Sequence, residues 1–230
     1  MEQWKKSIDE KGRYIGNVYE ILDQSFDFDF CIENMKKSLG TGHHSYRQTL
    51  IGGYSDLPHY IPADKIQERK DFVKNNNIRV WQQWHDIAWW GAGKDGPFQI
   101  IRDQLEAAMM KFIQTVYPER NYVKTDLQML GSWTVYEKGD FIANHQDGNN
   151  PGRVCAFLIY LSNHSTYHDS GGELLIENTD TVLPVRGNFV VLDFIKHNLW
   201  HEVHPVKDDF LRYCYLCFVT EQPNLKEKNE

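Results

Sequence analysis

The 230-residue sequence predicts an α+β protein that is mainly β, with N-terminal helices packed on one face of a sandwich, jelly roll or barrel. Two observations predict this fold class. Before residue 120 apolar residues recur at helical spacing, whereas after it short apolar runs alternate with turns rich in Gly, Asn, Asp and Pro. No repeat or linker divides the chain. We therefore expect one domain over 1–230, with a helical support region (1–120), a β core (121–220) and a tail (221–230).

The N-terminal elements are predicted mainly from helical periodicity. The strongest pattern runs into Pro118, which ends it, and another stops before Gly40. A third predicted helix has a weaker apolar pattern and is rich in charged residues. A short strand is expected before these helices. These elements are expected at Tyr19–Leu22 (strand), Phe28–Leu39, Asp64–Val73 and Gln99–Tyr117 (helices).

The β core is predicted from apolar runs of four to nine residues separated by turn sequences. The turns include Asp147-Gly148-Asn149-Asn150-Pro151-Gly152, Ser170-Gly171-Gly172 and Arg186-Gly187-Asn188. Seven strands are expected, at Gln128–Tyr136, Val154–Leu161, Glu173–Ile176, Thr181–Val185, Phe189–Phe194, His201–Pro205 and Arg212–Thr220.

Four of the seven tryptophans lie in one segment, between Trp81 and Trp90. Such a cluster is typical of core packing between helices and a barrel. It also fits a substrate wall or lid hinged at Gly91 and Gly93, because indole rings bind rings, cations and aliphatic chains. The sequence leaves both interpretations open.

Composition and charge exclude several classes of protein. Hydrophobic residues make up 41% and charged residues 25%, which excludes collagen and wholesale disorder. The net charge of −7 argues against a nucleic-acid partner. No run of 18 apolar residues and no apolar leader is present, so we expect no membrane contact and a cytoplasmic location. The four cysteines are expected to be reduced thiols.

Histidines near carboxylates are the first candidates for chemistry. In His145-Gln146-Asp147 the first and third residues point to the same side of an extended segment, so both can reach one ion. His201 follows 56 residues later, beside a predicted strand. Two imidazoles and one carboxylate on one side of a metal leave its opposite positions open, as in non-haem Fe(II) oxygenases.

Arg212 is the second candidate, because it leads the apolar strand Arg212–Thr220. Burying a guanidinium is costly unless it meets an anion, and its fork could hold the far carboxylate of a dicarboxylate co-substrate. His204 is a rival to His201, but strand alternation turns it to the other side, so we interpret it as structural.

The order of these motifs resembles the Fe(II)/2-oxoglutarate-dependent dioxygenases, and within them the prolyl 4-hydroxylase-like branch. The resemblance covers roughly residues 120–220. It is carried by His145-x-Asp147, Gly171-Gly172-Glu173-Leu174, Pro184-x-x-Gly187, His201-Glu202-Val203-x-Pro205-Val206 and Arg212. It implies a double-stranded β-helix, or jelly-roll, core over 121–220.

The resemblance also implies a cofactor set and roles for individual residues. Fe(II) would be bound by His145, Asp147 and His201, with 2-oxoglutarate and O2 as co-substrates and ascorbate as a further cofactor candidate. Arg212 would pair with the distal carboxylate of 2-oxoglutarate, assisted by Tyr160 and with Tyr136 lining the pocket. The carboxylate of Asp147 favours hydroxylation, since relatives that halogenate have Gly or Ala there.

The substrate implied is a small molecule, an amino acid or a peptidyl residue, proline included. Ile142 departs from the prolyl hydroxylase pattern, in which a Tyr often stands three residues before the first His. Two alternatives are a jelly-roll metal-binding module without catalysis and an oxidative demethylase of nucleic acid. Cys214-x-x-Cys217 is formally a CxxC, but in a strand these side chains face opposite sides, so we interpret them as buried hydrophobes. Nothing in the sequence indicates the oligomeric state.

Overall fold

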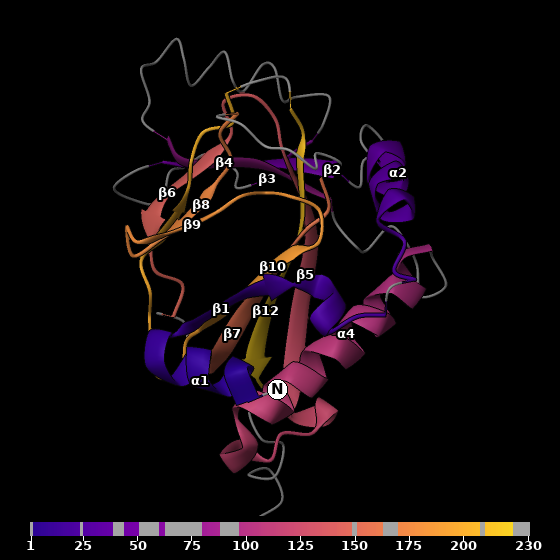
Figure 1. The fold of residues 1–230 in the computed structure, drawn as a ribbon. Helices are drawn as coiled ribbons and strands as arrows, with labels where there is room; N and C mark the ends of the chain where they lie inside the picture. Colours follow the sequence, from indigo (N-terminus) through magenta and orange to yellow (C-terminus); the bar gives the residue numbers. More distant parts are fainter. Residues whose placement is uncertain are drawn as a thin grey trace, which may run out of the picture.

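The computed structural model describes most of the chain, namely residues 2–23, 25–38, 44–50, 60–62, 80–87, 97–148, 151–162, 170–207 and 210–222. In this part of the chain three α-helices and twelve β-strands form a helical layer and a folded antiparallel sheet (Figure 1). The predicted fold class, mainly β with N-terminal helices on one face, is confirmed.

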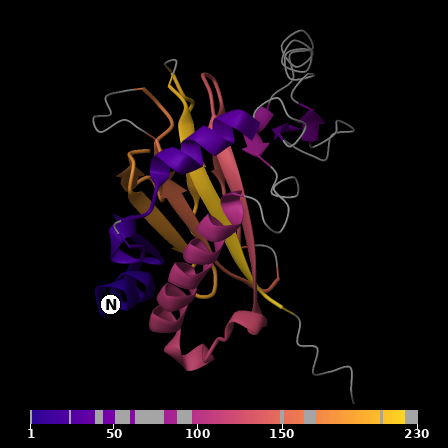
Figure 2. The same cartoon turned by 90° about the vertical axis from the view of Figure 1, so that its right-hand side faces the viewer.

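The helices are α1 (Glu2–Lys11), α2 (Phe28–Ser38) and α4 (Pro97–Val116), and Figure 2 shows α4 running along one face of the sheet. In α4 the buried residues recur three or four positions apart from Ile101 onward, and Pro118 follows its end. The two helices with the clearest periodicity are therefore confirmed, each to within two residues. Among the described residues, no helix has both the length and the apolar character needed to cross a membrane.

Eight strands build the β core, and each of the seven predicted strands overlaps one of them. The additional strand is β6, which carries His145. The strands are β5 (Leu127–Tyr136), β6 (Phe141–His145), β7 (Arg153–Tyr160), β8 (Leu174–Ile176), β9 (Asp180–Val182), β10 (Asn188–Asp193), β11 (His201–Val203) and β12 (Arg212–Glu221).

Four further strands come from the N-terminal region and complete the sheet. They are β1 (Arg13–Asn17), β2 (His44–Leu50), β3 (Tyr60–Pro62) and β4 (Val80–Ile87). The main path of paired strands is β1-β10-β7-β12-β5-β4-β6-β11-β8-β9, and β2 pairs with β3 and β4. Because β4 pairs with both β5 and β6, it joins the long-stranded half of the jelly roll to the half that contains β6 and β11.

The long strands separate two apolar cores by strict alternation of their side chains. On β12, Tyr213 and Tyr215 pack in the cluster beneath the helices, whereas Cys214 faces the inner cluster between the two halves of the sheet. Cys217 lies on the helix side. The prediction that Cys214 and Cys217 face opposite sides is thus confirmed, and both are free and buried, as are Cys31 and Cys155.

The strand predicted at Tyr19–Leu22 is wrong. The chain there forms a 3-10 helix, η1 (Val18–Glu20), after β1 has ended at Asn17. The Asn17 side chain accepts a hydrogen bond from the Tyr19 N–H, and the Glu20 carboxylate accepts one from the Asn17 N–H (2.8 Å). This reciprocal cap favours a turn over the extended conformation that the apolar residues indicate. Two more 3-10 turns, η4 (Pro118–Arg120) and η5 (Lys124–Asp126), connect α4 to β5.

Two other predictions concern the N-terminal region. The helix predicted at Asp64–Val73 lies outside the described residues. The first part of the tryptophan-rich segment is the strand β4, whose backbone pairs with β5 and β6. Trp81 and Trp84 are therefore part of a sheet strand, whereas Trp89 and Trp90 also lie outside the described residues.

Asp193 anchors the helical layer to the sheet. This fully buried carboxylate accepts hydrogen bonds from the Tyr117 hydroxyl (2.6 Å) and from the N–H groups of Ile195, Lys196 and His197. We expect Asp193→Ala to lower the free energy of unfolding by about 3 kcal/mol, because several buried donors lose their acceptor, and Tyr117→Phe by about 1 kcal/mol. Urea unfolding measures both, and a loss below ~1 kcal/mol for Asp193→Ala would contradict this role.

Candidate metal centre and co-substrate pocket

Two neighbouring strands bring the predicted metal ligands together. His145 is the last residue of β6 and His201 the first residue of β11, and the two stand directly opposite each other in the antiparallel pairing. Side chains at paired positions project from the same face of a sheet. Val203, two residues after His201, packs in the inner cluster, so this face is the one that lies between the two halves of the jelly roll.

Asp147 completes the group from the turn that follows β6. Its Oδ2 lies 3.3 Å from His201 Nε2, and its Oδ1 lies 3.7 Å from His145 Nε2. The candidate ligand atoms of the three residues lie within 4.8 Å of one another. It is the one cluster of at least three such groups in the part of the chain that the structure describes.

The surroundings of this cluster favour the protonation states that metal binding needs. Burial acts to raise the pKa of Asp147, but the hydrogen bond to His201 and the nearby charges outweigh it and leave the pKa lowered. His201 Nδ1 lies 3.1 Å from the Leu199 carbonyl oxygen, which can only accept, so this nitrogen carries the proton. The proton by which Nε2 bonds to Asp147 would be displaced by a bound cation, which would take the Nε2 lone pair.

His204 is not part of this cluster. Its side chain is 42% exposed and lies between two carboxylates, with Nδ1 3.6 Å from Glu173 and Nε2 3.1 Å from Glu202. The structural interpretation of His204, based on strand alternation, is consistent with this position.

Arg212 is buried on the inner face of β12, and its side chain is among the largest that are fully buried. Its Nε donates to the Gly172 carbonyl (2.8 Å) and its Nη2 donates to the Tyr160 hydroxyl (3.4 Å). A guanidinium has five N–H donors, so several remain for another acceptor. Within the described ranges no carboxylate forms an ion pair with Arg212, so this buried positive charge has no counter-ion in that part of the chain.

Two tyrosines enclose the guanidinium. Its central carbon lies 4.5 Å from the ring centroid of Tyr136 and 5.0 Å from that of Tyr160. The pKa of Tyr160 and of Tyr136 is raised, chiefly by burial, so both hydroxyls keep their protons at neutral pH. Gly172 has a φ of +77°, and a Cβ there would lie 3.0 Å from Arg212 Cδ, so a glycine allows its carbonyl to reach the guanidinium.

These donors fit the groups that the sequence implies. Two neutral imidazoles and one ionised carboxylate suit Fe(II) and leave coordination positions open. A buried guanidinium with no carboxylate partner among the described residues, beside a protonated tyrosine hydroxyl, suits one carboxylate of 2-oxoglutarate. Tyr136, Tyr160 and Val203 belong to the same inner cluster, so both groups of side chains face one interior.

Two residues beside the metal cluster were missed by the sequence analysis. Arg153 donates to the main-chain carbonyl of Asp147, and Asn198 accepts from the N–H of Gly148. Arg153 begins the apolar strand β7, just as Arg212 begins β12. The signal that identified Arg212, a charge at the head of an apolar strand, could therefore also have identified Arg153. The loop contact of Asn198 has no comparable sequence signal.

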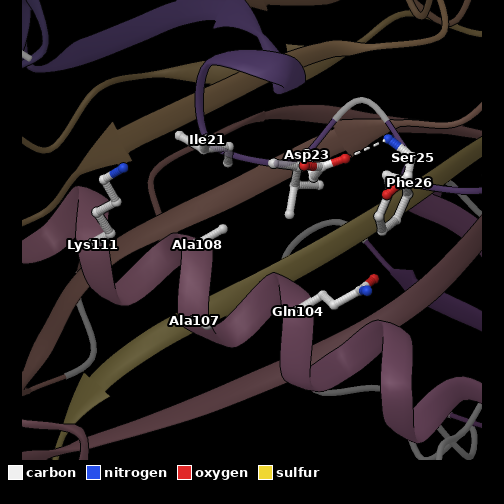
Figure 3. Close-up of a pocket in the computed structure, with 9 residues that line it drawn as sticks. Ile21, Asp23, Ser25, Phe26, Gln104, Ala107, Ala108 and Lys111 are labelled. Atoms are coloured by element: carbon white, nitrogen blue, oxygen red, sulfur yellow. Dashed lines mark hydrogen bonds between the residues drawn. The ribbon is translucent and has the colours of Figure 1, made fainter.

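A separate hollow lies on the helical side of the molecule and contains none of these residues. Its volume is about 350 Å³, and Figure 3 shows Gln104 and Lys111 of α4 on one side of it and Ile21, Asp23 and Phe26 on the other. The Asp23 carboxylate there accepts from the N–H of Ser25 (2.8 Å), which stabilises the turn before α2. Nothing in this hollow resembles the paired imidazoles of the metal cluster.

Comparison with known proteins agrees with the geometry. The sequence model of the 2OG-Fe(II) oxygenase superfamily matches residues 131–220. No curated protein sequence matches the chain. The match begins within β5 and ends within β12, so it includes every candidate ligand and Arg212.

Solved structures share the fold at low sequence identity. A prolyl-4-hydroxylase from Pseudomonas putida is 16% identical with a TM-score of 0.57, over 96% of this chain and 98% of that chain. A Trichoplax adhaerens prolyl hydroxylase in complex with a peptide fragment of hypoxia inducible factor is 14% identical with a TM-score of 0.54, over 96% and 88%. The non-heme alpha ketoglutarate dependent epimerase SnoN from nogalamycin biosynthesis is 9% identical with a TM-score of 0.59, over 96% and 82%. The predicted double-stranded β-helix is thereby confirmed: residues 131–220 match the sequence model of the 2OG-Fe(II) oxygenase superfamily, and the fold is similar to that of a prolyl-4-hydroxylase.

Proposed function

We propose that this enzyme couples the oxidative decarboxylation of 2-oxoglutarate to the hydroxylation of a C–H bond in an amino acid, a peptidyl residue or another small molecule. One observation carries the proposal. A His-Asp-His cluster faces the same interior as a buried arginine that has no carboxylate partner among the described residues. A metal-binding module without catalysis would need the first of these features but not the second.

The roles follow from the contacts of each side chain. His145, Asp147 and His201 bind Fe(II), because their donor atoms converge. Arg212 binds the distal carboxylate of 2-oxoglutarate. Tyr160 accepts a hydrogen bond from Arg212, which leaves its own O–H free to donate to the same carboxylate.

The protein supplies binding, orientation and exclusion of water. When bound, Fe(II) and 2-oxoglutarate supply the oxidation, which releases succinate and CO2. The ring of Tyr136 covers one side of the Arg212 guanidinium and keeps water from it. This strengthens the attraction between Arg212 and an anion, because charges interact more strongly in a dry environment.

The substrate class rests on the structural neighbours and on Ile142. Two neighbours are named as prolyl hydroxylases, and one of them holds a peptide, so a peptidyl residue is our first candidate. Ile142 packs against the inner cluster and offers no hydroxyl where many prolyl hydroxylases have a tyrosine. We therefore extend the proposal to residues other than proline.

We also propose one domain for 1–230, in which the region 1–120 supports the core. Its strands β1 and β4 pair with β10 and with β5 and β6, so the support region completes the sheet. The four free, buried cysteines support a reducing compartment such as the cytoplasm.

The test measures succinate formation by the Fe(II)-reconstituted protein in air and with ascorbate. The candidate substrates are free amino acids, peptides with and without proline, and a methylated single-stranded oligonucleotide. We expect slow succinate formation without substrate and severalfold faster formation with one amino acid or peptide, accompanied by a mass gain of one oxygen. If only the oligonucleotide stimulated succinate formation, the activity would be oxidative demethylation of nucleic acid rather than hydroxylation of an amino acid or peptide. If the protein bound Fe(II) tightly but formed no succinate, it would be a metal-binding module without catalysis.

A further inference from the structure

The peptide group that follows Asp147 is held at both ends by side chains. Arg153 Nη1 donates to the Asp147 carbonyl oxygen at 2.6 Å. On the other side of the same peptide bond, the N–H of Gly148 donates to Asn198 Oδ1 at 2.9 Å. Since a peptide group is planar, fixing its C=O and its N–H fixes the orientation of the whole plane. We call Arg153 and Asn198 together the Asp147 clamp.

Each member of the clamp is itself fixed. Arg153 is only 17% exposed, and its guanidinium lies 4.1 Å from the ring centroid of Phe218 on β12. Asn198 lies three residues before His201, and its own carbonyl accepts a hydrogen bond from the Gln146 side chain. The turn that carries Asp147 is therefore attached to the segment that carries His201.

Gly148 makes this attachment possible. A Cβ at this position would lie 2.6 Å from Asn198 Oδ1, which is closer than real Cβ contacts. The backbone can thus approach the Asn198 side chain because residue 148 is a glycine.

The two carboxylate oxygens of Asp147 have different neighbours. Oδ1 lies 3.3 Å from Arg153 Nη1 and 3.7 Å from His145 Nε2, whereas Oδ2 lies 3.3 Å from His201 Nε2. Arg153 therefore contacts the carboxylate as well as the main chain of Asp147. Each oxygen of this carboxylate faces one of the two candidate imidazole ligands.

We propose that Arg153 and Asn198 are positioning residues that hold the Asp147 turn in the orientation that binds the metal. This inference rests on the proposed metal centre and deepens it. Pre-orientation spares the ordering of a carboxylate on a turn, which would otherwise oppose binding.

The test is titration of the metal-free protein with Mn(II), followed by the loss of the free-ion EPR signal, so it needs no turnover. Residues that support metal ligands typically contribute ~10–100-fold to metal affinity. We expect Arg153→Ala and Asn198→Ala each to raise the Mn(II) Kd at least ~10-fold. The double variant should bind Mn(II) more weakly than either single variant. Its Kd should rise by less than the product of the two single increases, because both residues hold one peptide group.

Matched controls separate positioning from general stability. Arg186 also pairs with a carboxylate, that of Asp29, and lies over the ring of Phe28. The Asn188 side chain, like that of Asn198, bonds the main chain, although it donates to the Leu183 carbonyl rather than accepting from an N–H. Arg186→Ala and Asn188→Ala should leave the Mn(II) Kd unchanged. In Arg153→Lys, whose ammonium can still donate to the Asp147 carbonyl, the Kd should return toward the wild-type value.

The outcomes distinguish this inference from the proposed function. Wild-type protein that does not bind Mn(II) would overturn the metal centre itself. If the wild type bound Mn(II) tightly and both alanine variants had an unchanged Kd, the positioning role of the clamp would be wrong, but the metal centre would not be contradicted. Asn198→Ala changes only a loop side chain, so it keeps the test decisive if Arg153→Ala does not fold. Equal weakening in the Arg186 control would also overturn the clamp.

Discussion

Replacing His201 with alanine is expected to weaken Fe(II) binding by more than ~100-fold and to abolish succinate formation. Variants of residues that merely support a ligand lose ~10–100-fold in metal affinity, so loss of a ligand must cost more. His201 is 6% exposed, and its Nε2 faces Asp147 Oδ2 at 3.3 Å, so no solvent-side group can replace it. The measurement is the iron content after anaerobic reconstitution, together with the succinate formed per protein.

His204→Ala is the matched control, because it removes an imidazole only three residues away on the chain. Its side chain contacts Glu173 and Glu202 rather than the metal cluster. We expect iron content and turnover close to the wild-type values. If His204→Ala lost the iron and His201→Ala kept it, the ligand assignment would be wrong.

The second large effect is expected at Arg212, where alanine should raise the 2-oxoglutarate Kd by roughly 30- to 5,000-fold. Removing one partner of a buried charged pair costs ~2–5 kcal/mol, which corresponds to that range of affinity. Arg212→Lys keeps the charge but loses the fork that reaches Gly172 and Tyr160, so it should fall between wild type and alanine. Iron content should stay near normal in both variants.

Tyr160→Phe should weaken 2-oxoglutarate binding less than Arg212→Ala does, by about 0.5–1.5 kcal/mol, which corresponds to ~2- to 12-fold in affinity. Tyr213→Phe is the control, since Tyr213 lies on the helix side of β12, the strand that carries Arg212, and its hydroxyl has no hydrogen-bond partner within the described ranges. It should leave 2-oxoglutarate affinity unchanged. The assay is succinate formation against 2-oxoglutarate concentration. An unchanged 2-oxoglutarate affinity in Arg212→Ala would contradict the assignment of Arg212 to the co-substrate.

The sequence predicts those elements whose formation depends on local pattern. In α4 the 3.6-residue spacing of apolar side chains is long and ends at Pro118. In β7 and β12 the apolar runs are nearly continuous, because both faces of these strands are buried. The candidate metal ligands and Arg212 could be named from the sequence for a similar reason, since each lies in a short motif at or beside an element boundary.

Other elements depend on partners far away in the chain. In α1 only Trp4 and Ile8 are buried, and Trp4 stacks on Phe112 of α4 at 4.9 Å, so its stability comes from packing rather than from its own pattern. The strand β6 is short and contains Asn144 and His145, and pairing with β11 and β4 makes it extended. The contacts of Asn198 likewise exist only in the folded chain, so no spacing rule predicts them.

The pairing of β1 with β10 affects how this protein can fold during synthesis. Arg13 stands opposite Leu192, so the partner of the first strand leaves the ribosome roughly 180 residues later. At ~5–20 residues per second this is a delay of roughly 10–35 s. Until then the apolar face of α1, with Trp4 and Ile8, has no sheet to cover. Folding is therefore expected to be late and slow, with closure of the sheet as its rate-limiting event and a need for chaperone protection of the nascent N-terminal region.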